Sequence, residues 1–185
     1  MLADLSPVIA ATTQWLIRAY PASGGALASA LCEVQARQAV TVAAWLRYPT
    51  AMDAALLGMT GPGGSARLDR VIGSDVGQDA LDPEDAEDVQ DAEDSAWRSW
   101  VDEVVASWAA CLLTDPALAA SAVAGLADGE HAAGVPVEFR RLVRPDDRDR
   151  RAAALLRHPD LLAPVAGLHR APLLDRLGPD QALIA

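Results

Sequence analysis

The stretch that decides the fold class runs from Trp97 to Cys111 and reads WRSWVDEVVASWAAC. Its large apolar residues recur at alternating spacings of four and three, which is typical of a helix that buries one face. Trp100 lies beside the same stripe. We predict that this face packs into a core through Trp97, Val101, Val104, Trp108 and Cys111.

The start of this helix is predicted upstream, at Asp82 and Pro83. An Asp cap, a first-turn proline and negative charge at the positive end of the helix dipole together favour a helix start. We expect the longest helix of the chain to begin here, with acidic first turns and a buried second half.

The rest of the chain also favours helices. Ala occupies 39 of the 185 positions, and Ala loses no side-chain entropy on entering a helix. Prolines and cap residues divide the chain, because proline suits a first turn but not a helix interior. Further helices are expected over about 6–20, 23–48, 50–59, 116–129, 137–143 and 146–158, followed by one-turn or two-turn pieces. Helix starts are expected at Ser6 with Pro7 and at Asp115 with Pro116, and the expected cap residues are Ser23, Thr50 with Asp53, and Asp146.

We therefore predict a single all-α domain over residues 1–185, folded as a compact multi-helix bundle. Residues 60–82 are rich in Gly, Ser and Asp, and are expected to form a mobile loop. Residues 60–96 thus make up a loop and an acidic helix start within the domain, and the C-terminal part is punctuated by prolines.

A helical-repeat arrangement of αα-hairpins is the alternative. Residues 112–126 align with 155–168 if one residue is skipped, and 45–49 echo the beginning of both. Each segment reads as a helix end followed by a proline-started helix. The irregular intervals between them favour a bundle, because a solenoid needs at least about three regular units.

The acidic residues are concentrated in one segment, 75–94, which contributes about −10 of the formal net charge of −11 and contains no basic residue. It can be a solvated linker, a mimic of nucleic acid that masks a basic protein surface, or a calcium site. An EF-hand loop does not fit, because 82–94 lacks the required Gly. The acidic arm proper comprises Asp82, Glu84, Asp85, Glu87, Asp88, Asp91, Glu93 and Asp94.

A second charged segment, 140–157, holds seven of the fifteen arginines. It can be a solvated helix face with pairs such as Asp147 with Arg151, or a docking surface for an acidic partner or for the acidic arm. Nucleic acid is a less favoured partner, because stacking aromatics are scarce and the net charge opposes phosphate. The candidate partner-binding residues are Arg140, Arg141, Arg144, Arg148, Arg151, Trp97, Trp100 and Trp108.

The chain offers few groups for chemistry. Its three histidines show no metal-binding spacing, so we expect no metal and no cofactor. No phosphate loop, dinucleotide fingerprint or nucleophile elbow is present, and the absence of Lys excludes Schiff-base chemistry. Cys32 and Cys111 lie in apolar helical contexts and are expected to be free thiols. The sequence shows neither a leader nor an apolar run that would span a bilayer, so we expect a cytoplasmic protein, with a composition that GC-rich bacterial coding would produce.

The leading hypothesis is a non-enzymatic accessory or adaptor protein. It would bind a partner protein, a larger complex or a second copy of itself through the Trp-bearing helix and the segregated charges. An acidic nucleic-acid mimic is the second hypothesis. A small helical enzyme that uses His131 or His158 with neighbouring carboxylates is the third.

Overall fold

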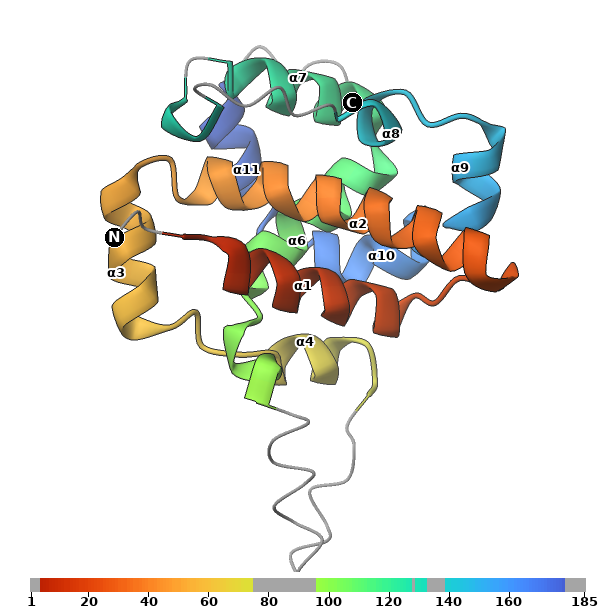
Figure 1. The fold of residues 1–185 in the computed structure, drawn as a ribbon, viewed down its shortest axis with the longest axis horizontal. Coiled ribbons are helices and arrows are strands. Elements are labelled where there is room, and N and C mark those ends of the chain that lie inside the picture. The colour runs from red at the N-terminus through yellow and green to blue at the C-terminus, as the bar shows by residue number, and fades with distance from the viewer. Residues whose placement is uncertain (1–3, 75–95, 128, 133–138, 179–185) are drawn as a thin grey trace, which may run out of the picture.

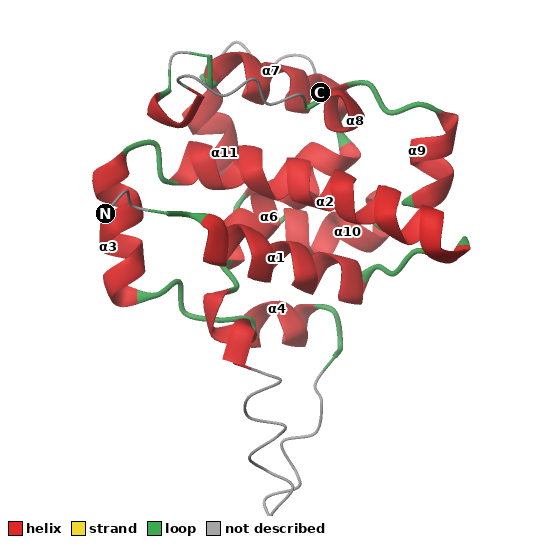
Figure 2. Cartoon of the chain, in the orientation of Figure 1, coloured by secondary structure: helices red, strands yellow, loops and turns green. Residues whose placement is uncertain are grey.

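The computed structural model describes residues 4–74, 96–127, 129–132 and 139–178, and in these residues the fold is all-α (Figures 1 and 2). The predicted fold class is therefore confirmed. The α-helices are α1 Ser6–Ala19, α2 Gly25–Arg47, α3 Ala51–Thr60, α4 Ala66–Val71, α6 Glu103–Thr114, α7 Pro116–Gly125, α8 Arg140–Val143, α9 Asp147–Ala152, α10 Pro159–Ala166 and α11 Arg170–Leu177. Two short 3-10 helices, η1 Ala96–Trp100 and η2 Glu130–Ala132, accompany them.

The core forms around α2 and α6. Every residue of α6 from Val105 to Leu113 is buried, so this helix is enclosed on all sides, as expected for a helix without a polar face. It packs against α2, α10, α7 and α11, while α2 also contacts α1, α8 and α9. Fully buried alanines allow a close approach of α2 and α6. These are Ala36, Ala39, Ala43, Ala44, Ala106, Ala109 and Ala110.

This arrangement is that of a bundle rather than a repeat array. Helices distant in sequence are in contact, such as α2 with α9 and α10 with both α4 and α6. A solenoid would restrict each hairpin to its neighbours along the chain. Among the residues that the structure describes, no helix is both long and apolar enough to cross a membrane.

The predicted continuous helix through Trp97 and Cys111 is wrong. Trp97 and Trp100 lie in η1, and α6 begins after a break at Val101 and Asp102. The break occurs because Asp102 adopts an extended conformation and caps α6, with its Oδ1 accepting a hydrogen bond from the Val105 N–H at 2.9 Å. The expected helix start at Asp82 lies outside the described residues. Within them, α2 is the longest helix.

Local cap chemistry was predicted well at the starts of α3, α7 and α9. At α7, Asp115 Oδ1 accepts hydrogen bonds from the Ala117 and Leu118 N–H groups. Thr50 and Asp53 form a reciprocal capping box at α3, and Asp146 caps α9 in the same way with Asp149. Ser23 does not cap α2, however, because that helix begins one residue later, at Gly25, after a cap position held by Gly24.

Three other boundaries also differ from expectation. Helix α7 ends at Gly125 rather than near Gly129, and α9 ends at Ala152 rather than near His158. The region expected to be a loop contains α4, which is anchored by the fully buried Leu68.

Candidate functional site

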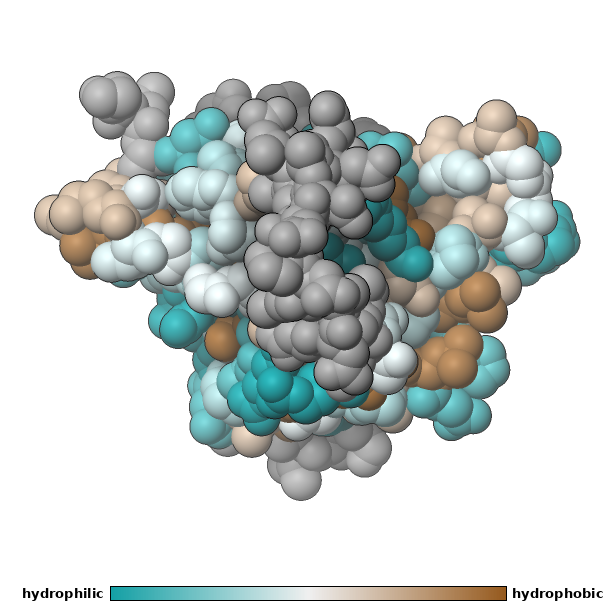
Figure 3. Space-filling model, turned by 90° about the horizontal axis from the view of Figure 1, so that it is seen from below, coloured by the Kyte–Doolittle hydropathy of each residue, from teal (hydrophilic) through white to brown (hydrophobic). Residues whose placement is uncertain are grey.

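The most unusual surface feature is an apolar ridge on α3. Met52, Leu56 and Met59 are 69%, 52% and 79% exposed, and their spacing of four and three places them on one side of the helix. Only Ala54 and Leu57 of this helix are buried. Figure 3 shows tan and brown atoms at its left edge, which is the side on which α3 lies in Figure 1. Exposed apolar residues that gather in this way mark interaction surfaces in many proteins.

The ridge is held in place by hydrogen bonds at the start of α3. The Thr50 N–H donates to Asp53 Oδ2 at 3.0 Å, and the Asp53 N–H donates to Thr50 Oγ1 at 3.2 Å. Hydrogen bonds from Thr50 hold the pKa of the Asp53 carboxyl below its usual range. The Ala51 N–H donates to Glu130 Oε2 at 3.0 Å, which links α3 to η2. The ridge is therefore presented on a fixed helix.

A polar groove of about 460 Å³ lies directly beside the ridge, and Leu56 belongs to both. Three carboxylates, from Asp53, Asp102 and Glu103, line the groove together with the guanidinium of Arg47. Among the lining residues negative charge therefore exceeds positive charge, although Arg67, outside the lining, offsets part of it through an ion pair with Glu103. Such a pairing of apolar ridge and acidic groove suits an apolar segment that carries basic residues.

Asp102 lines this groove and joins three helices. Its Oδ2 accepts a hydrogen bond from the Tyr48 hydroxyl at 2.5 Å, and its own N–H donates to Thr12 Oγ1 at 3.1 Å. Burial and the hydrogen bond to Asp102 raise the pKa of the Tyr48 phenol. Because Asp102 also caps α6, this single carboxylate fixes the geometry where α1, α2 and α6 meet.

Glu103 belongs to a second cluster that sequence reasoning missed. Its Oε1 lies 2.6 Å from His169 Nε2 and 3.0 Å from Arg67 Nη1. The fully buried Ser107 hydroxyl accepts a hydrogen bond from the His169 backbone N–H rather than facing the imidazole, so these residues do not form a nucleophilic triad. Because Glu103 and His169 are 66 positions apart in the sequence, no local pattern reveals the pair.

The predicted Trp surface divides into two environments. Trp108 is buried in α6 and its Nε1–H donates to the His169 carbonyl, whereas Trp97 and Trp100 are half-buried in η1. The guanidinium groups of Arg18 and Arg98 lie 4.9 and 5.2 Å from the Trp97 ring centroid. The three side chains therefore do not form one exposed stripe.

Asp69 ties η1 to the body of the protein. Its Oδ2 accepts a hydrogen bond from Arg98 Nη1 at 2.7 Å, and its Oδ1 accepts one from Trp15 Nε1 at 2.8 Å. Ser65 also donates to this carboxylate at 2.7 Å. Asp69 thereby connects α1, α4 and η1.

No protein-family model, curated protein or solved structure matches the chain. Its function is therefore inferred from its own surfaces.

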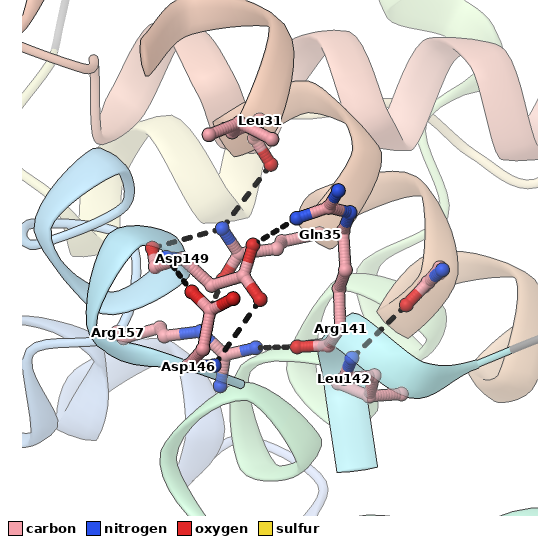
Figure 4. A network of polar contacts seen from close by, with 8 residues as sticks. Leu31, Gln35, Arg141, Leu142, Asp146, Asp149 and Arg157 are labelled. Atoms are coloured by element: carbon pink, nitrogen blue, oxygen red, sulfur yellow. Dashed lines mark hydrogen bonds and ion pairs between the residues drawn. The ribbon is translucent and has the colours of Figure 1, made fainter. Parts of the chain in front are cut away.

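Two arginines of the 140–157 segment serve the interior, as Figure 4 shows. Arg141 forms an ion pair with Asp149, a carboxylate that is fully buried. The Arg157 Nε donates to Gln35 Oε1 at 2.5 Å, and its two terminal nitrogens donate to the carbonyls of Leu113 and Arg141 at 2.9 and 2.6 Å. Burial lowers the pKa of Arg157 to about 10, so this guanidinium remains charged at neutral pH. The network binds α9 to α2 and α6.

The other candidate arginines are on the surface. Arg140, Arg144, Arg148 and Arg151 are exposed. The surface ion pair of Asp147 is formed with Arg150 at 3.4 Å, rather than with Arg151 as expected. The acidic arm lies outside the described residues.

The histidines of the enzyme hypothesis occupy different settings. His131 Nε2 lies 2.6 Å from the Tyr48 carbonyl, and its ring stacks on Trp45 at a centroid distance of 5.8 Å. His158 is exposed and precedes α10 without a side-chain cap bond. Within the described part of the chain, no group of three or more His, Cys, Asp or Glu side chains could hold a metal ion.

Proposed function

We propose that this protein is a non-enzymatic accessory or adaptor protein that binds a partner protein. The observation that carries the proposal is the ridge of Met52, Leu56 and Met59, which leaves large apolar side chains in water on a well-anchored helix. Such exposure is unfavourable in the free protein and is relieved when a partner covers it. Methionine suits this role because its flexible side chain adapts to different partners.

The charge beside the ridge supports a partner segment with basic residues. Asp53, Asp102 and Glu103 line the adjoining groove, and the acidic segment 75–94 joins the described fold after α4 and before η1. Negative charge on this scale accelerates the approach of a basic partner and disfavours an acidic one. We infer that the partner binds by an amphipathic helix or strand with apolar residues over the ridge and basic residues over the groove.

The exposed arginines Arg140, Arg144, Arg148 and Arg151 provide a second surface of opposite charge. An adaptor needs two binding surfaces, and this one suits an acidic partner or a second copy of the chain. We place the protein in the cytoplasm, because its two cysteines are free and buried, as is usual in a reducing compartment.

A ridge variant tests the proposal directly. The double variant Leu56→Glu and Met59→Glu replaces exposed residues, so its melting temperature should stay close to that of the parent. The parent protein, used as bait in native lysate, should capture a stoichiometric partner. The double variant, used in the same way, should fail to capture it. Leu27→Glu is the matched control, because Leu27 is 64% exposed on the N-terminal turn of α2 and should retain the partner.

Salt and a deletion separate the forces involved. A partner held mainly by the apolar ridge should remain bound at about 1 M salt, where exposed charges are screened. Removal of residues 75–94 should slow its association without abolishing binding. If the deletion abolishes partner binding while the ridge variant binds normally, the nucleic-acid-mimic hypothesis is favoured instead. If every variant captures the same partners as the parent, the adaptor proposal is contradicted.

A further inference from the structure

A separate cavity of about 350 Å³ lies at the C-terminal end of α2, between α7, η2 and α11. In Figure 1, α7 lies on the opposite side of α2 from α1. Cavities of roughly 300–1,000 Å³ hold small-molecule ligands in other proteins. Its principal lining residues are Trp45, Leu46, Ser121, Leu126, His131 and Arg176.

The walls are mainly apolar. Trp45 and Leu46 contribute from α2, and Leu126 and Leu177 from the ends of α7 and α11. The Trp45 ring is fixed by two aromatic neighbours, since it stacks on His131 and meets Phe139 edge-on at 5.9 Å. An aromatic or branched aliphatic body would replace water in this space favourably.

The polar groups of the cavity favour an anion. Arg176 lines it and, among the described residues, has no carboxylate within ion-pair distance, although its charge helps to lower the pKa of Asp53 nearby. The two neighbouring carboxylates, Asp53 and Glu130, are not part of the lining and accept backbone hydrogen bonds at the start of α3. A guanidinium with a free planar face binds a carboxylate through two parallel hydrogen bonds.

His131 and Ser121 supply further polar groups. Because the Tyr48 carbonyl can only accept, His131 Nε2 carries the proton of that 2.6 Å hydrogen bond. Nδ1 of His131 and the Ser121 hydroxyl have no hydrogen-bond partner among the described residues, so both can serve a ligand.

We propose that this cavity binds a small organic carboxylate with an aromatic or branched apolar body. The carboxylate pairs with Arg176, and the body packs between Trp45 and Leu126. The cavity shares no lining residue with the acidic groove beside α3. A nucleotide is disfavoured, because one guanidinium in a cavity of this size cannot serve several phosphates.

Binding of defined probes to the full chain tests the proposal. Phenylacetate, indole-3-acetate and isovalerate are titrated by calorimetry and by ligand-observed NMR, beside phenylacetamide as the neutral match of the first probe. At least one carboxylate should bind, and phenylacetamide should bind at least about tenfold more weakly than phenylacetate, since a charge-assisted pair is lost. Absence of binding by all three carboxylates overturns the proposal.

Variants assign the binding to this cavity. Arg176→Gln should weaken the carboxylate about tenfold or more and leave the affinity for phenylacetamide unchanged, because only the charged pair is removed. Arg151→Gln, an exposed arginine on another helix, is the matched control and should bind like the parent. Ser121→Trp fills the cavity and should abolish binding of both probes. Equal affinities in parent and Arg176→Gln would place the ligand elsewhere and refute the site.

Discussion

Replacement of Asp102 by Ala should destabilise the protein more than loss of any exposed carboxylate. Asp102 is only 4% exposed and serves both as the cap of α6 and as the acceptor for the Tyr48 hydroxyl. Loss of an N-cap costs about 1 kcal/mol, within a range of roughly 0.5–2. A half-buried phenol left without its charged acceptor adds about 1–2 kcal/mol. The free energy of unfolding should therefore fall by about 2–3 kcal/mol.

Two companion variants divide this loss. Asp102→Asn keeps Oδ1 for the cap and replaces Oδ2 by an amide nitrogen that can donate to the phenol oxygen, so it should lower the free energy of unfolding by only about 1 kcal/mol. Tyr48→Phe removes the donor alone. A double-mutant cycle of Tyr48→Phe with Asp102→Ala should give a coupling energy of about 1–2 kcal/mol, because the two side chains are in direct contact.

Urea unfolding at pH 7, followed by tryptophan fluorescence, measures all of these values. For a chain of this length, a loss of about 2–3 kcal/mol corresponds to a fall in melting temperature of roughly 4–12 °C. Asp147→Ala is the control, since that carboxylate is 83% exposed and should leave the midpoint unchanged. If Asp102→Ala and Asp147→Ala unfold at the same urea concentration, the assigned role of Asp102 is wrong.

Three further predictions follow from buried polar groups. Because burial and a carboxylate neighbour raise the pKa of the Tyr48 phenol above its unfolded value, its contribution to stability is complete below about pH 10 and lost at higher pH; urea midpoints measured from pH 8 to 11 should fall less steeply in Tyr48→Phe. Arg157→Lys should lower the free energy of unfolding by about 2–4 kcal/mol, because an ammonium cannot reproduce the three hydrogen bonds of the guanidinium. Arg151→Lys should leave the urea midpoint unchanged in the same assay. Burial raises the pKa of Cys32 to about 11 and also raises that of Cys111, so neither thiol should react with a disulfide reagent at pH 8 until urea unfolds the chain, and a rapidly labelled thiol in the native protein would contradict the packing.

Helix starts were predictable where the cap chemistry is local. Thr50 with Asp53, and Asp146 three residues before Asp149, are recognisable within four residues, and the structure contains both boxes. The break before α6 was missed because the apolar spacing continues across it. The residues that stabilise the break, Thr12 and Tyr48, lie on other helices and carry no signal near Asp102.

The candidate surfaces were predictable only in part. The composition of 140–157 shows its charge, but not that Arg141 and Arg157 bind buried acceptors contributed by α2, α6 and α9. The ridge on α3 was not recognised, because apolar residues occur on every side of this helix. Tertiary packing, rather than the sequence of the helix itself, decides which of these residues stay exposed. In the fold, Ala54 and Leu57 are the two residues of α3 that are buried.

The position of Asp69 makes the protein suitable for loop engineering. Its carbonyl accepts a hydrogen bond from the Ser74 N–H at 2.9 Å, and its side chain holds Arg98, so one residue secures the chain on both sides of 75–95. When the fold itself fixes two such anchor points, the closure entropy of a flexible linker placed between them changes by only about 0.6 kcal/mol for each doubling of its length. Linkers of different lengths in place of 75–95 would therefore be held at the same two points by a single carboxylate-bearing residue.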